Sequence, residues 1–178
     1  MSRRRTALPT MLLLALPVAC VALGGCGESV PPEVLTVREQ LLLEQEPQGA
    51  VTIEQARRQV ADNPEVTLIV KVGNRNFEDW SAEDQATFYV SEGYPESDYN
   101  IGPDHDPSTC PFCRWKWKEE DSYAVIQVVD QQGEVLPHSA GTVFDLAPGK
   151  VVTVTGDGSV DAHGFLVVQL SGLFAHPG

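Results

Sequence analysis

The chain has 178 residues, a formal net charge of −13 at pH 7 and a hydrophobic content of 42%, with 15 Gly and 13 Pro. This length accommodates one domain of ordinary size and excludes a multidomain assembly. The acidic balance argues against nucleic acid or an anionic membrane surface as a partner, because the charge term that dominates such binding would be repulsive.

The first 25 residues have the pattern of an export leader. Arg3, Arg4 and Arg5 form a positive segment, and the apolar run at 11–23 is too short to span a bilayer as a permanent helix. The pattern predicts a secretory signal peptide over residues 1–25. Removing its three arginines lowers the formal net charge from −13 to −16.

A cysteine follows this leader directly. Leu23-Gly24-Gly25-Cys26 resembles the lipobox of bacterial lipoproteins, in which an aliphatic residue and two small residues precede a cysteine. The resemblance implies cleavage before Cys26, acylation of its thiol with chains such as palmitate, and a lipid-anchored place in the cell envelope. A residue other than Asp at Gly27 implies sorting to the outer membrane in a Gram-negative cell. The alternative is an ordinary secretory signal that leaves Cys26 as a thiol.

Residues 26–50 predict an acylated tether, because prolines and a polar run at 44–48 interrupt them, with at most one helical turn at 41–43. A folded domain is expected over 51–178. It begins with a short helix, since Thr52 and Gln55 have capping-box spacing and the helical pattern stops before Pro64.

Beyond this helix the hydrophobic period changes to two. Strands are predicted at 66–72, 86–90, 123–129, 150–155 and 164–173, with a shorter one at 134–138 and one helical turn at 142–146. Several short strands with few helices predict a small antiparallel barrel or sandwich.

The late strand pair carries the segments LAPGKVVTVTG and GFLVVQLSGL. Their spacing resembles the OB-fold, in particular the tRNA-anticodon-binding-like group and its exported relatives, at Leu146, Gly149, Lys150, Val152, Val154 and Gly156. The resemblance implies a mainly β, five-stranded OB-like antiparallel barrel. Where that family connects two strands directly, this chain has an insertion at 91–122.

The insertion contains Cys110-Pro-Phe-Cys113, for which three interpretations remain open. It resembles the active-site motif of thioredoxin-like oxidoreductases, with Cys110 as nucleophile and Cys113 as resolving thiol. The context differs, because the preceding segment is polar and the following residues predict strands. Haem attachment of the c type is excluded, since Arg114 stands where a histidine is required.

The second interpretation is a zinc site, because two cysteines separated by two residues can face one tetrahedral ion. His105 is a candidate third ligand, and His138 would have to arrive from a neighbouring strand. The third interpretation is a disulfide between Cys110 and Cys113, formed in an oxidising compartment and closing only a short loop.

Trp115 and Trp117 alternate with basic residues, so an extended segment would place both indoles on one face. They are candidates for stacking on sugar rings or bases, or they cover the barrel. The charge and compartment disfavour nucleic acid, which leaves a saccharide or an envelope protein as partner. Without a Gly-x-Ser-x-Gly, P-loop or HExxH motif, the sequence favours a non-enzymatic binding or scaffold module over the alternative, a membrane-tethered thiol-disulfide oxidoreductase.

Overall fold

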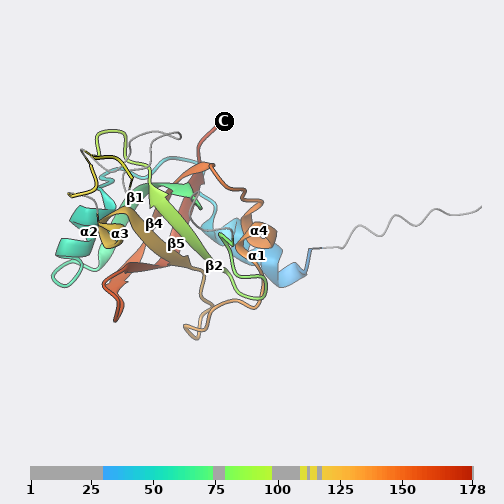
Figure 1. Cartoon of the computed structure of the whole chain (residues 1–178). Coiled ribbons are helices and arrows are strands. Elements are labelled where there is room, and N and C mark those ends of the chain that lie inside the picture. The colour runs from blue at the N-terminus through green and yellow to red at the C-terminus, as the bar shows by residue number, and fades with distance from the viewer. Residues whose placement is uncertain (1–29, 74–78, 98–108, 112, 116–117, 178) are drawn as a thin grey trace, which may run out of the picture.

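The computed structural model describes residues 30–73, 79–97, 109–111, 113–115 and 118–177, and a closed barrel of five strands lies at its centre. The order around the barrel is β1-β2-β3-β5-β4, and pairing of β4 with β1 closes it (Figure 1). The strands are β1 (Glu65–Val72), β2 (Thr87–Glu92), β3 (Tyr123–Gln127), β4 (Val151–Val160) and β5 (Leu166–Ala175). The mainly β, five-stranded barrel predicted from the sequence is confirmed.

One strand pair differs from an all-antiparallel barrel. β3 runs parallel to β5, with Ala124 opposite Leu166, whereas the other four neighbouring pairs are antiparallel. The reason is geometric, because an odd number of strands cannot alternate in direction all the way around a closed ring. Membership of the OB-fold group itself stays a prediction.

The alternation in the sequence corresponds to the inside and outside of the barrel. In β1 the side chains of Val66, Leu68, Val70 and Val72 are buried, and the residues between them are partly exposed. Successive side chains of a strand point to opposite faces, so the apolar set fills the interior. This interior and the helices around it share one hydrophobic core.

Two helices lie close to their predicted positions. α2 (Ile53–Gln59) begins with the predicted capping box: Gln55 N donates to Thr52 Oγ1, and Thr52 N donates to Gln55 Oε1, each over 3.1 Å. α4 (Ala140–Phe144) overlaps the turn expected at 142–146, and Ser139 Oγ caps it by accepting from Thr142 N. A third short helix, α3 (Glu119–Ser122), leads directly into β3.

Residues 30–50, which fall within the predicted tether, form a helix and pack against the barrel. α1 (Pro32–Leu41) starts at a proline, a residue well suited to the first helical turn, where no backbone donor is needed. Val34 is buried, and the partly buried Val37 and Leu41 follow it at helical spacing. After the helix, Leu43 N donates to Leu173 O of β5 over 2.9 Å. The helix therefore ends at Leu41 instead of forming a single turn at 41–43.

The strand expected at 134–138 is absent from this described segment, which has only an isolated bridge between Val129 and Val135. The late strands are longer than predicted, because β4 and β5 extend on either side of a tight connection at 161–165. No helix in the described ranges is both long enough and apolar enough to cross a membrane.

Gly156 lies where β4 shifts its register against β5, and a Cβ atom there would stand 2.1 Å from Gln169 O. We expect Gly156→Ala to destabilise the barrel by about 3 kcal/mol or more, since the obstacle is backbone of the neighbouring strand. Urea denaturation measures the change. Gly141→Ala is the matched control, because its Cβ would meet nothing closer than 3.8 Å, and helix propensity favours alanine there. Equal midpoints for the two variants would contradict this account of the register shift.

Candidate functional site

The insertion between β2 and β3 leaves the barrel beside the start of α2. Glu92, the last residue of β2, is 3% exposed, and its carboxylate accepts from Ile53 N at 2.9 Å and from Tyr94 N at 2.8 Å. Burial raises the pKa of Glu92, and the hydrogen bonds from Tyr94 and Ile53 oppose that rise. The carboxylate thus holds the start of the insertion on the first turn of α2.

The insertion returns to the barrel beside the same helix. Asp121 in α3 is 1% exposed, and Arg57 of α2 donates from both Nε and Nη2 to its Oδ1 atom, the Nε contact measuring 3.0 Å. Two buried carboxylates, Glu92 and Asp121, therefore hold the two ends of the insertion on α2. The sequence did not reveal this arrangement, because acidic residues show no burial pattern and their partners are distant in the chain.

The two cysteines of the insertion lie in a tight turn. Cys110 O accepts from Cys113 N at 3.2 Å and from Arg114 N at 3.0 Å, and both cysteines are half-buried. In the part of the chain that the structure describes, no disulfide joins them. Figure 1 shows this turn, in yellow, on the side of the barrel that carries α2 and α3.

The structure does not bring His138 together with these cysteines. His138 Nε2 lies 3.7 Å from Glu33 Oε1, beside α1 and α4. Within the described ranges, no group of three or more His, Cys, Asp or Glu side chains could hold a metal ion. His105 lies outside those ranges, so a zinc site that uses it stays a prediction.

Trp115 is 80% exposed, which contradicts the idea that its indole covers the barrel. It follows the cysteine turn directly and is the most exposed of the large apolar side chains that the structure describes. Trp117 lies outside the described residues. Stacking on a ligand stays a prediction for both.

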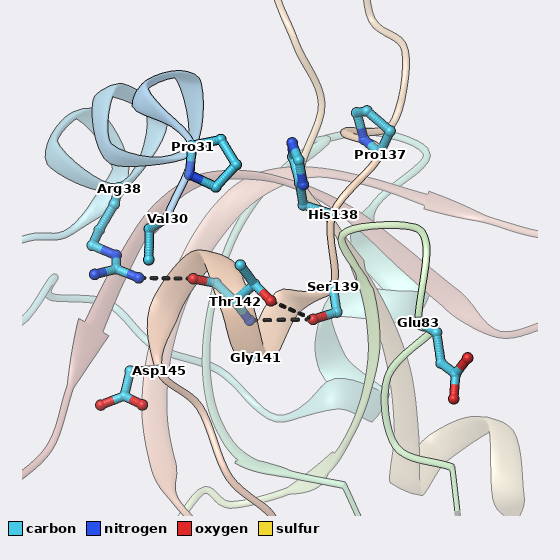
Figure 2. A pocket seen from close by; sticks show the side chains of 10 residues that line it. All are labelled: Val30, Pro31, Arg38, Glu83, Pro137, His138, Ser139, Gly141, Thr142 and Asp145. Atoms are coloured by element: carbon cyan, nitrogen blue, oxygen red, sulfur yellow. Dashed lines mark hydrogen bonds between the residues drawn. The ribbon is translucent and has the colours of Figure 1, made fainter. Parts of the chain in front are cut away.

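A pocket of about 700 Å³ lies on the other side of the barrel, between α1 and α4 (Figure 2). Val30 and Pro31 before α1, His138 before α4 and Asp145 after α4 contribute to its wall. Arg38 also lines it, but the guanidinium donates to Thr142 O at 2.7 Å and to Val143 O at 2.6 Å. Arg38 thus joins α1 to α4 by binding carbonyls at the end of that short helix.

Thr153, His176 and Glu46 have the composition of a hydrolytic triad, but the hydroxyl of Thr153 is inaccessible. Thr153 Oγ1 lies 3.1 Å from Glu46 Oε1 and 2.8 Å from His176 Nε2, and Thr153 is 0% exposed. Its single proton suits the carboxylate, so His176 Nε2 acts as the donor to Thr153. Because no substrate can reach this hydroxyl, the group holds the segment after α1 on the barrel and has no catalytic geometry.

No protein-family model matches the chain, and no curated protein matches it.

We expect Arg57→Leu to destabilise the protein by about 3 kcal/mol, because Asp121 would remain buried without its cation. Arg58→Leu is the matched control. Arg58 is exposed and pairs with Glu54 in the same helix, so its loss should cost about 0.5 kcal/mol or less. Urea denaturation of both variants at pH 7 makes the comparison, and similar losses would show that the buried pair does not hold the insertion.

Glu92 should make the protein less stable as pH rises. Its folded-state pKa lies above the usual value of 4.5, so the folded state binds the proton more tightly than the unfolded state. This contribution is fully present below about pH 4.5 and is lost as pH rises through the folded-state pKa. Ionisation of Glu92 should therefore lower the urea midpoint of the wild-type protein between pH 4 and pH 7. Glu92→Gln keeps an oxygen acceptor but cannot ionise, so its urea midpoint should decline less over this range. Glu65→Gln, at an exposed position, is the control. Parallel profiles for wild type and Glu92→Gln would contradict the prediction.

Proposed function

We propose that the protein is a lipid-anchored binding or scaffold module at the bacterial cell envelope, with acylated Cys26 as anchor and the insertion as binding surface. One observation supports the assignment of the insertion as the binding surface. Trp115 is 80% exposed on a segment whose two ends are fixed to α2 by buried carboxylates. A large indole presented on a fixed support is the kind of anchor that dominates the energy of protein interfaces.

The chemistry around Trp115 suggests the class of partner. Its neighbour Arg114 is also exposed, so an aromatic face and a cation are offered together. Such a pair suits a saccharide, on which the indole can stack, or an acidic or aromatic patch of an envelope protein. The formal charge of −13 continues to disfavour nucleic acid.

The cysteine turn has a supporting role in this proposal. Cys110 and Cys113 lie in one backbone turn directly before Trp115. A disulfide or a bound zinc ion would restrict this turn and so reduce the ordering cost of binding. A disulfide is the simpler choice in an exported protein, because its compartment is oxidising.

The alternative function is thiol-disulfide exchange. Both cysteines are half-buried, and the cationic Arg114 follows Cys113, a setting that favours a thiolate. Cys110 thiolate would attack a substrate disulfide, and Cys113 thiolate would then displace the bound sulfur. The substrate would leave as a dithiol, and the pair would remain oxidised.

The anchor is tested by intact mass and by fractionation of the protein expressed with its leader. The wild-type chain is expected to begin at residue 26, to carry the added mass of acyl chains and to sediment with membranes. Cys26→Ser is expected to lack the added acyl mass, because its hydroxyl does not replace the thiol that is acylated. A wild-type protein without the added mass would overturn the anchor.

The same preparation distinguishes binding from redox chemistry. A binding module should reduce a glutathione mixed disulfide no faster than its Cys110→Ser variant does, whereas an oxidoreductase should lose its turnover in that variant. Native mass spectrometry of a soluble chain that starts at Gly27 then shows whether Cys110 and Cys113 form a disulfide or hold a zinc ion. A mass lower by two hydrogens indicates a disulfide, and one added zinc ion indicates a metal site.

A further inference from the structure

We infer that the barrel stands directly on the membrane, with the surface around the start of α1, α4 and residues 137–139 facing a layer of zwitterionic phospholipid headgroups. We call this surface the α1/α4 face. The inference rests on the lipid anchor proposed above and adds an orientation to it. It assigns the α1/α4 face to the lipid and leaves the insertion, with Trp115, on the side directed away from the membrane.

The length of chain between the anchor and the domain is the first argument. Only four residue steps separate Cys26 from Val30, and a fully extended chain covers about 3.6 Å per step, or about 14 Å in all. Val30 already packs against the hydrophobic core. The interfacial layer of a bilayer is itself about 5–8 Å thick on each side. The start of α1 must therefore lie at the headgroups or within about 10 Å of them.

The second argument is the attachment of α1 to the barrel. Val34 is 1% exposed, Arg38 donates two hydrogen bonds to carbonyls of α4, and Leu43 N donates to Leu173 O of β5. These contacts make α1 part of the domain, so the short connection limits the position of the whole barrel. A flexible tether reaching to residue 50 would instead have allowed about 85 Å of extended chain.

The composition of the α1/α4 face decides which lipid suits it. Pro31, Pro137 and the exposed Leu35 supply apolar surface, while Glu33, Glu83 and Asp145 supply negative charge at or beside the pocket. The cation of the pocket, Arg38, is engaged by carbonyls of α4. An anionic surface would be repelled, whereas the ammonium ions of the headgroups can pair with these carboxylates. A zwitterionic surface, which carries no net charge, avoids this repulsion and still offers ammonium groups to the carboxylates.

The opposite side of the barrel carries the features assigned to binding. Figure 1 shows α2, α3 and the cysteine turn on one side of the barrel and α1 and α4 on the other. A domain of this size is about 30–35 Å across, so the two sides lie at very different distances from the membrane surface. Standing on the α1/α4 face presents Trp115 to the envelope space, where a partner can reach it.

The test uses the acylated full chain in phosphatidylcholine vesicles with a nitroxide quencher at the headgroups. A fluorophore is attached to one introduced cysteine, Glu83→Cys at the pocket or Asp62→Cys beyond α2, in a background carrying Cys110→Ser and Cys113→Ser. Quenching at position 83 is expected to be at least about threefold stronger than at position 62, because the domain is wider than the reach of the quencher. A variant with 20 Gly/Ser residues inserted after Gly27 should lose the difference, since such a linker is flexible.

Each other outcome contradicts the inference in a recognisable way. Equal quenching at the two positions, with the acyl mass present, would overturn the orientation and leave the anchor intact. Stronger quenching at position 62 would show that the insertion faces the lipid. A purified chain without acyl mass would overturn the anchor and the orientation together, and the mass of the same sample reveals this before any vesicle is prepared.

Discussion

Closure of the barrel is the constraint on which the rest of the structure depends. Pairing of β1 with β4 joins the first strand to the late hairpin and leaves none of the five strands with an unpaired edge. Because five strands cannot alternate in direction around a ring, closure also requires at least one parallel pair, which in this protein is β3–β5. Gly156, where β4 and β5 change register, allows the backbones of these two strands to approach closely within the ring. The helices and the insertion are arranged around a ring that does not depend on them for its strand order.

Around this ring, α2 and α1 have different tasks. α2 holds both ends of the insertion through the buried carboxylates of Glu92 and Asp121, one on a helix N-terminus and one on Arg57. α1 instead brings the N-terminal segment onto the barrel through its apolar side and through Arg38. The two helices therefore link the barrel to the two parts of the chain with proposed roles, the binding surface and the anchor. Their positions on different sides of the ring separate these roles in space.

Much of the fold could be predicted because it depends on patterns between residues that are close together in the sequence. The alternation in β1 and the capping box at Thr52 each involve residues only a few positions apart, and both are present as expected. The helix at 32–41 was missed because its prolines suggested irregular chain, although a proline in the first turn is compatible with a helix. The parallel pair follows from counting strands, once closure is known. The candidate site was harder to predict: the partner of Glu92 is 39 residues away, and the exposure of Trp115 depends on tertiary structure alone.

Fixing both ends of the insertion on one helix has an evolutionary consequence. We expect the residues after Gly93 and before Asp121 to tolerate changes in length or composition without disturbing strand pairing, because their attachment points belong to the scaffold. The barrel and α2 thus form a scaffold that can carry different loops between the same two attachment points, much as immunoglobulin frameworks carry different loops. Related chains that share the two buried carboxylates and the arginine would then be free to diverge in what they recognise. Among such proteins, the residues at positions 57, 92 and 121 would reveal common ancestry better than the sequence of the loop would.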